Sequence, residues 1–102
     1  MIYVPNGSLE EAQNLSKYLI EKKYVACSNI FPITSNFNWN FKVENQSDFV
    51  TIFKTRKENW NFLQQELSRI HSYECPCIIK LDCDANEEYI KWVFKETVDC
   101  NK

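Results

Sequence analysis

Apolar residues recur at steps of three and four positions in two segments of the chain, the spacing of a helix with one buried face. These segments run over about 8–23 and 55–71. Each begins with Ser or Thr followed three residues later by Glu, which is the spacing of a capping box. A third helix is expected over about 87–98, with Asn86 as its N-cap.

Apolar runs and period-two alternation predict the strands. They are expected over residues 1–4, 24–33 continued by 36–43, 48–55 and 75–83. Pro32 marks an edge, a bulge or a break, because proline has no N–H for a sheet ladder. The clearest alternation places four apolar side chains on one face, namely Phe37, Trp39, Phe41 and Val43. A hairpin loop is expected at 44–47.

The resulting order is β-α-β-β-α-β followed by a C-terminal helix, in one domain over 1–102. This is the α+β, ferredoxin-like split βαβ arrangement, which by itself implies no function. The hairpin is long for so small a domain, so it would extend beyond the core. An overhanging strand edge needs something to pair with.

Composition narrows the class of protein. The 102 residues carry a net charge of -2, which gives no basic surface suited to nucleic acid, and no apolar run is long enough for a membrane helix. Five cysteines and no secretion signal favour free thiols in the cytoplasm. Aromatic residues make up 15%, more than a small core holds easily, so some are expected to face a partner subunit. The single glycine, Gly7, excludes a glycine-rich phosphate loop, and catalysis is not expected.

Five blocks of sequence, in order and at near-constant spacing, resemble the divalent-cation tolerance (CutA) family. They are KYVACSNI at 23–30, SNFNWNFKVE at 35–44, KT at 54–55, HSYECP at 71–76 and YIKW at 89–92. The chain differs from the family pattern at Phe41 (Gly in the family), Ser72 (Pro) and Cys77 (an acidic residue).

The resemblance implies a homotrimer of ferredoxin-like subunits in which each long hairpin pairs with a neighbouring sheet. It also implies a non-enzymatic role in tolerance of divalent metals, above all copper. Two alternatives stay open: a trimeric sensor, similar to the PII proteins, that binds a small anion between subunits, and a trimeric scaffold for a partner protein.

Metal ligands are the first candidate chemistry. His71 matches a copper ligand proposed for the family, and Cys27 and Cys77 supply thiolates suited to copper. No cofactor is required. The structural alternative is that His71 stabilises a helix end, and that Cys75, Cys77 and Cys83 share the apolar face of a strand and fill the core.

A polar pocket is the second candidate. The resemblance implies a cleft between subunits, and the residues at the matching positions are Lys54, Tyr73, Glu74, Trp39 and Trp92. A lysine, a tyrosine and flat aromatic walls would suit a small anion. The alternative is an interface in which Lys54 and Glu74 form an ion pair and the tryptophans pack.

Overall fold

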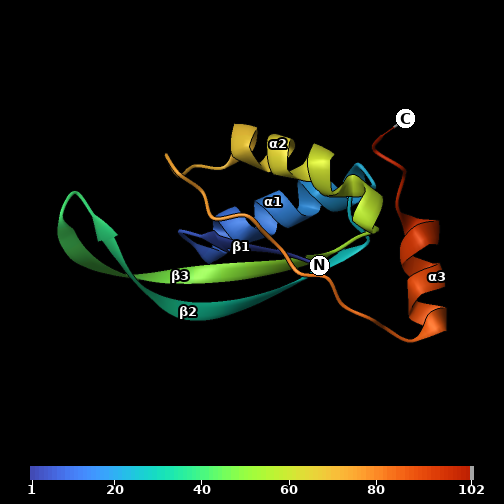
Figure 1. Ribbon diagram of the computed structural model, residues 1–102, viewed down its shortest axis with the longest axis horizontal. Helices are drawn as coiled ribbons and strands as arrows, with labels where there is room; N and C mark the ends of the chain where they lie inside the picture. Colours follow the sequence, from blue (N-terminus) through green and yellow to red (C-terminus); the bar gives the residue numbers. More distant parts are fainter. Residues whose placement is uncertain (102) are drawn as a thin grey trace.

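The computed structural model describes residues 1–101 and shows a four-stranded antiparallel sheet with helices α1 and α2 across one face (Figure 1). Helix α3 lies at one end of the sheet and the hairpin β2–β3 projects from the other. The elements are β1 Ile2–Asn6, α1 Leu9–Glu21, β2 Cys27–Trp39, β3 Lys42–Lys54, a 3-10 turn Lys57–Asn59, α2 Trp60–Ile70, β4 Ile79–Lys80 and α3 Glu87–Glu96. The strand order β2-β3-β1-β4 confirms the α+β, ferredoxin-like fold.

The start of α1 is as predicted. Ser8 Oγ accepts a hydrogen bond from the Glu11 N–H at 3.1 Å, and the Glu11 carboxylate accepts one from the Gly7 N–H at 3.2 Å. Ala12 and Leu19 are fully buried and Leu15 is partly buried, which confirms the expected helix with one buried face.

The predicted start of the second helix was wrong. Thr55 does not cap it, because its Oγ1 donates to the Tyr24 carbonyl oxygen at 2.7 Å. A single 3-10 turn follows, and α2 begins only at Trp60. Its buried face is nevertheless the predicted one, since Leu63 and Leu67 are fully buried.

The hairpin turn lies earlier than predicted. Asn40 and Phe41 both have positive φ, 53° and 68°, as in a two-residue type I′ turn. Residues 44–47, expected to form the loop, belong to β3. Val43 lies opposite Asn38, so it faces the other side from Phe37 and Trp39. The sequence analysis missed this turn because it contains no glycine, and a phenylalanine rarely adopts the left-handed conformation.

Strand β2 is continuous through Pro32, which lies opposite Phe49. It is an edge strand, so the absent proline N–H costs no ladder hydrogen bond on the open side. The predicted alternative of an edge position is therefore correct, and a break at Pro32 is excluded.

The core lies between the sheet and the two helices. Its buried apolar residues are Ile2, Val4, Leu19, Val25, Phe53, Leu63 and Leu67. The opposite sheet face carries no helix (Figure 1), and Tyr3, Phe31 and Ile52 lie on it without being fully buried.

The segment expected as a strand over 75–83 pairs with β1 only at Ile79 and Lys80. The interpretation of its three thiols as core residues was wrong for the single chain, because Cys75, Cys77 and Cys83 are exposed. The three cysteines lie outside the short strand β4, so strand periodicity does not apply to them, and the residue of this segment that packs against the core is Ile78.

Candidate functional site

His71 lies at the C-terminal end of α2, and both its ring nitrogens have partners. Nδ1 accepts a hydrogen bond from the Tyr73 N–H at 3.0 Å, so the ring proton is on Nε2, which donates to the Pro5 carbonyl oxygen at 2.8 Å. This pairing orients the loop that follows α2. A metal ion could bind His71 only by displacing one of these two partners.

The same loop is fixed to the hairpin through Tyr73. Its hydroxyl donates to Asp48 Oδ1 at 2.7 Å, and Ser35 Oγ donates to Asp48 Oδ2 at 2.7 Å. Gln46 Nε2 lies 2.6 Å from Asp48 Oδ1 and 3.0 Å from the Tyr73 oxygen. Asp48 is just beyond the end of β1, whose last residue, Asn6, pairs with Phe49.

The electrostatics of this cluster follow from its hydrogen bonds. Burial alone would raise the pKa of the Asp48 carboxyl, but the hydrogen bonds from Tyr73, Ser35 and Gln46 outweigh it and hold that pKa below its usual value. Burial and the bond to Asp48 raise the pKa of Tyr73 far above its usual value. At neutral pH, Tyr73 therefore stays protonated and donates a hydrogen bond to the ionised Asp48 carboxylate.

Cys75 and Cys77 follow Tyr73 along the same loop, and both are exposed. Partial burial raises the pKa of the Cys77 thiol, and a negative charge on Cys75 would raise it further. Two thiols separated by one residue suit a soft ion such as Cu(I).

Cys27 lies at the other end of the hairpin. It pairs with Lys54 at the end of β3, whereas Tyr73 contacts Asp48 six residues earlier, about 20 Å away at the usual rise of a strand. Its Sγ is 3.0 Å from the Tyr89 hydroxyl oxygen. That hydrogen bond, together with burial, raises the pKa of Tyr89 to about 12.

The predicted metal ligands are therefore not brought together within one chain. Cys77 follows His71 and Tyr73 on the loop, while Cys27 is at the opposite end of the sheet. Among residues 1–101, no group of three or more His, Cys, Asp or Glu side chains is arranged to hold a metal ion.

The predicted pocket residues are also divided. Lys54 lines a cavity of about 710 Å³ beside α3, and its Nζ donates to Asn29 Oδ1. Trp92 lies outside that cavity but packs on Tyr89, with ring centroids 5.6 Å apart. Tyr73 and Glu74 are on the loop after α2, and Trp39 is near the hairpin tip. One chain does not unite the five.

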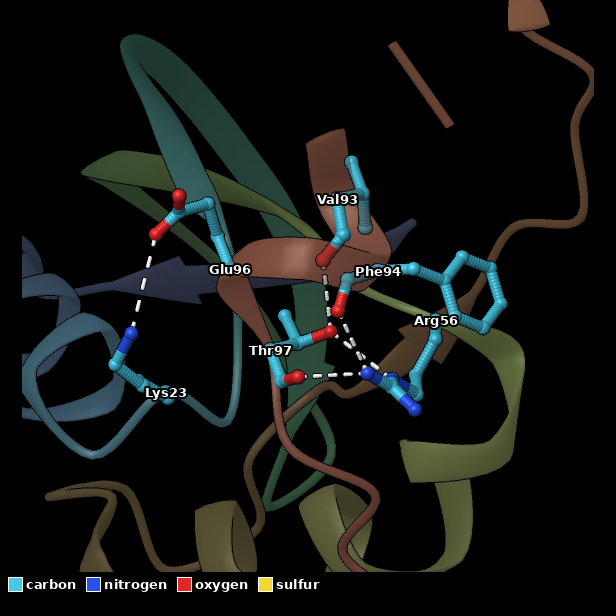
Figure 2. A network of polar contacts seen from close by, with 6 residues as sticks. All are labelled: Lys23, Arg56, Val93, Phe94, Glu96 and Thr97. Carbon is cyan, nitrogen blue, oxygen red and sulfur yellow. Dashed lines mark hydrogen bonds and ion pairs between the residues drawn. The ribbon is translucent and has the colours of Figure 1, made fainter. Parts of the chain in front are cut away.

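Sequence reasoning missed the residues that hold α3 in place, which Figure 2 shows. Arg56 Nη2 donates to the carbonyl oxygens of Phe94 at 2.8 Å and Thr97 at 2.6 Å, and Nε donates to Thr97 Oγ1 at 3.0 Å. The guanidinium also stacks on the Phe94 ring, 4.7 Å from its centroid. Lys23 and Glu96 form an exposed ion pair at 3.9 Å. No spacing in the sequence signals contacts between positions this far apart.

None of the helices in residues 1–101 combines the length and the apolar character required to cross a membrane.

Comparison with known proteins places these features in a family. Residues 1–96 match the family described as CutA1 divalent ion tolerance protein. A divalent-cation tolerance protein CutA from Archaeoglobus fulgidus is 42% identical over 99 residues, which is 96% of each chain. A solved structure described as a periplasmic divalent cation tolerance protein CutA from the same organism has a TM-score of 0.90 at 41% identity, covering 93% of this chain and 94% of that one.

Two further solved structures extend the comparison. CutA1 from Pyrococcus horikoshii has a TM-score of 0.92 at 32% identity, covering 95% of this chain and 96% of that one. A PII-like protein CutA from Nostoc has a TM-score of 0.88 at 27% identity, covering 96% and 97%. Sequence match and fold agree over nearly the whole length, and the chain belongs to the CutA1 divalent ion tolerance family.

Proposed function

We propose that this chain is a non-enzymatic, cytoplasmic homotrimer that binds copper and acts in tolerance of divalent metal ions. Membership of the family supports the role in tolerance. The shape of the subunit supports assembly: it measures 45 × 26 × 23 Å, and β2 and β4 are open edges on opposite sides of the sheet. Pairing the β2 edge of one copy with the β4 edge of the next is a head-to-tail contact, which closes into a ring of three when successive copies are rotated by a third of a turn.

Assembly also accounts for apolar surface that the single chain leaves uncovered. Phe31 and Trp39 are 38% and 42% exposed on β2. Cysteines 75 and 77 precede β4 on the other open edge. In the proposed ring, the hairpin of one copy lies beside the thiols of its neighbour.

The observation that carries the copper proposal is the pair of exposed thiols at Cys75 and Cys77. Thiolates are the ligands that Cu(I) prefers, and only Pro76 separates these two exposed thiols along the chain. His71 and Cys27 are weaker candidates, because each already has a hydrogen-bond partner. They would join the site only by giving up that partner or from another subunit.

A competition titration with Cu(I) against a chromogenic chelator tests this assignment. Replacing Cys77→Ser or Cys75→Ser is expected to weaken binding at least tenfold, while Cys83→Ser, an exposed thiol further along the chain, serves as the matched control. His71→Ala and Cys27→Ser report whether those residues contribute. Affinity should rise with pH, because copper must displace the thiol protons. Unchanged affinity in both the Cys75 and the Cys77 variants would contradict the proposal.

Light scattering tests assembly independently of copper. A mass of three chains is expected, and a monomer at micromolar concentration would contradict the ring.

The second candidate function is a sensor of a small anion, similar to the PII proteins. The observation that favours it is the cavity beside Lys54, which Arg56, Lys57 and Lys80 also line. A relative described as PII-like shares the fold. A small anion that raises the melting temperature, where copper does not, would favour this function over the first.

A further inference from the structure

The cavity beside α3 concentrates positive charge in a chain whose net charge is negative. Lys54, Arg56, Lys57 and Lys80 all line it, and Asp82 is the one carboxylate among its lining residues. The whole chain has twelve Lys plus Arg against fourteen Asp plus Glu, so this excess is local. It favours an anion over a cation or a neutral ligand.

Not all four cations are free to meet a ligand. Arg56 is used by the Phe94 and Thr97 contacts that hold α3 (Figure 2), and Lys54 is bonded to Asn29. Lys57 is exposed, and Lys80 has only a long, exposed ion pair of 3.8 Å with Asp82. Lys57 and Lys80 are thus the two cations that a ligand can engage without breaking the fold.

Most of the remaining lining is apolar. Leu81, Ile90 and Phe94 line the cavity and are 37%, 40% and 42% exposed. Further apolar residues of the wall are Ile2, Trp60, Ala85 and Val93. Binding a nonpolar group over these exposed apolar side chains is favourable, by roughly 25 cal/mol for each Å² of apolar surface removed from water.

We infer that this cavity binds a small amphipathic monoanion, a carboxylate with a nonpolar tail, with the tail against Leu81, Ile90 and Phe94 and the carboxylate between Lys57 and Lys80. The cavity volume of about 710 Å³ is within the range of ~300–1,000 Å³ that is usual for sites of small organic ligands. One carboxylate can be bound by Lys57 and Lys80 together, while Lys54 and Arg56 keep their contacts with neutral groups and still add to the positive potential around it. This inference deepens the anion-sensing candidate and rests on it.

The fluorescence of Trp60, which lines the cavity, provides the readout. In a Trp39→Phe/Trp92→Phe background, Trp60 is the only tryptophan left. The probes are octanoate, octylamine with the same tail and the opposite charge, and acetate with the same charge and almost no tail. Octanoate is expected to change the emission saturably and to bind at least tenfold more tightly than the other two.

Charge-neutralising variants locate the carboxylate. Lys57→Gln and Lys80→Gln are each expected to weaken octanoate binding about two- to fivefold, the range usual for a partly exposed charge pair. Lys91→Gln is the matched control, because Lys91 is on α3 but pairs with Glu87 and does not line the cavity. It should leave the affinity unchanged.

The outcomes separate the ligand class from the function on which it rests. Octanoate and octylamine binding equally well, or octanoate binding unaffected by both cavity variants, would overturn the inference. Acetate or sulfate binding as tightly as octanoate would overturn the amphipathic class and leave the anion sensor in place. No response to any anion would overturn both, while light scattering reports separately whether the trimer has formed.

Discussion

The hydrogen bond between Tyr73 and Asp48 fixes the loop that carries the two candidate copper thiols. The substitution Tyr73→Phe removes this hydrogen bond and keeps the aromatic side chain. Asp48 is 3% exposed and is charged at neutral pH, so it loses one charge-assisted donor at 2.7 Å. Hydrogen bonds to charged groups contribute about 1.5–3 kcal/mol. Ser35 and Gln46 still donate to the carboxylate, so we expect a loss of about 2 kcal/mol in the free energy of unfolding.

Urea unfolding at pH 7 and at fixed protein concentration measures this loss. Tyr3→Phe is the matched control, because the Tyr3 hydroxyl has no hydrogen-bond partner within residues 1–101, and it should change stability by less than about 0.5 kcal/mol. Tyr73→Phe should also loosen the loop, which would appear as faster amide exchange at Cys75 and Cys77.

The pH dependence gives a second, independent check. The pKa of Asp48 in the folded chain is below the value of about 3.9 usual for an unfolded aspartate. Its contribution is therefore complete above about pH 4 and is lost as the pH falls through the folded-state pKa. Tyr73→Phe raises that pKa, so the difference between wild type and variant should be largest at neutral pH and shrink below about pH 4. A difference that stays constant from pH 7 to pH 3 would refute the reasoning.

Two further predictions concern the hairpin turn and a buried amide side chain. Phe41→Gly should stabilise each subunit by about 1 kcal/mol, because the left-handed φ of 68° costs a phenylalanine about 1–2 kcal/mol and glycine offsets part of the gain through its greater unfolded-state entropy. The melting temperature of Phe41→Gly, compared with that of Phe41→Ala, which keeps the backbone strain, checks this prediction. A lower melting temperature for Phe41→Gly would contradict it and would indicate that the Phe41 side chain is buried in an interface. Asn59→Ala should lower the free energy of unfolding by about 3 kcal/mol. The fully buried Asn59 amide donates to the carbonyl oxygens of Tyr24 and Val98 and accepts from the Cys100 N–H, and the variant leaves these three groups without that partner. Asn86→Ala, at an N-cap without a side-chain hydrogen bond, is the control in the same urea assay.

The candidate site shows where sequence reasoning reached its limit. His71 and Tyr73 each have defined hydrogen-bond partners and Lys54 lines a cavity, but their roles in a functional site stay predictions. Sequence reasoning could not group these residues, because the grouping depends on which end of the sheet each one occupies. Asp48 was not singled out at all, since one aspartate in a strand has no spacing signal until Tyr73 is known to reach it.

The sequence by itself determined the order of the elements, the buried faces of α1 and α2, and the capping of α1. These follow from contacts between residues three or four positions apart, which the chain encodes locally. Tertiary structure alone decided the position of the hairpin turn, the exposure of Cys75, Cys77 and Cys83, and the Arg56 contacts that hold α3. The physical reason is the same in each case: the favourable energy comes from partners distant in sequence, or from covering surface that the single chain lacks. Local periodicity predicts that a face is apolar, but what covers that face depends on the tertiary structure and on assembly.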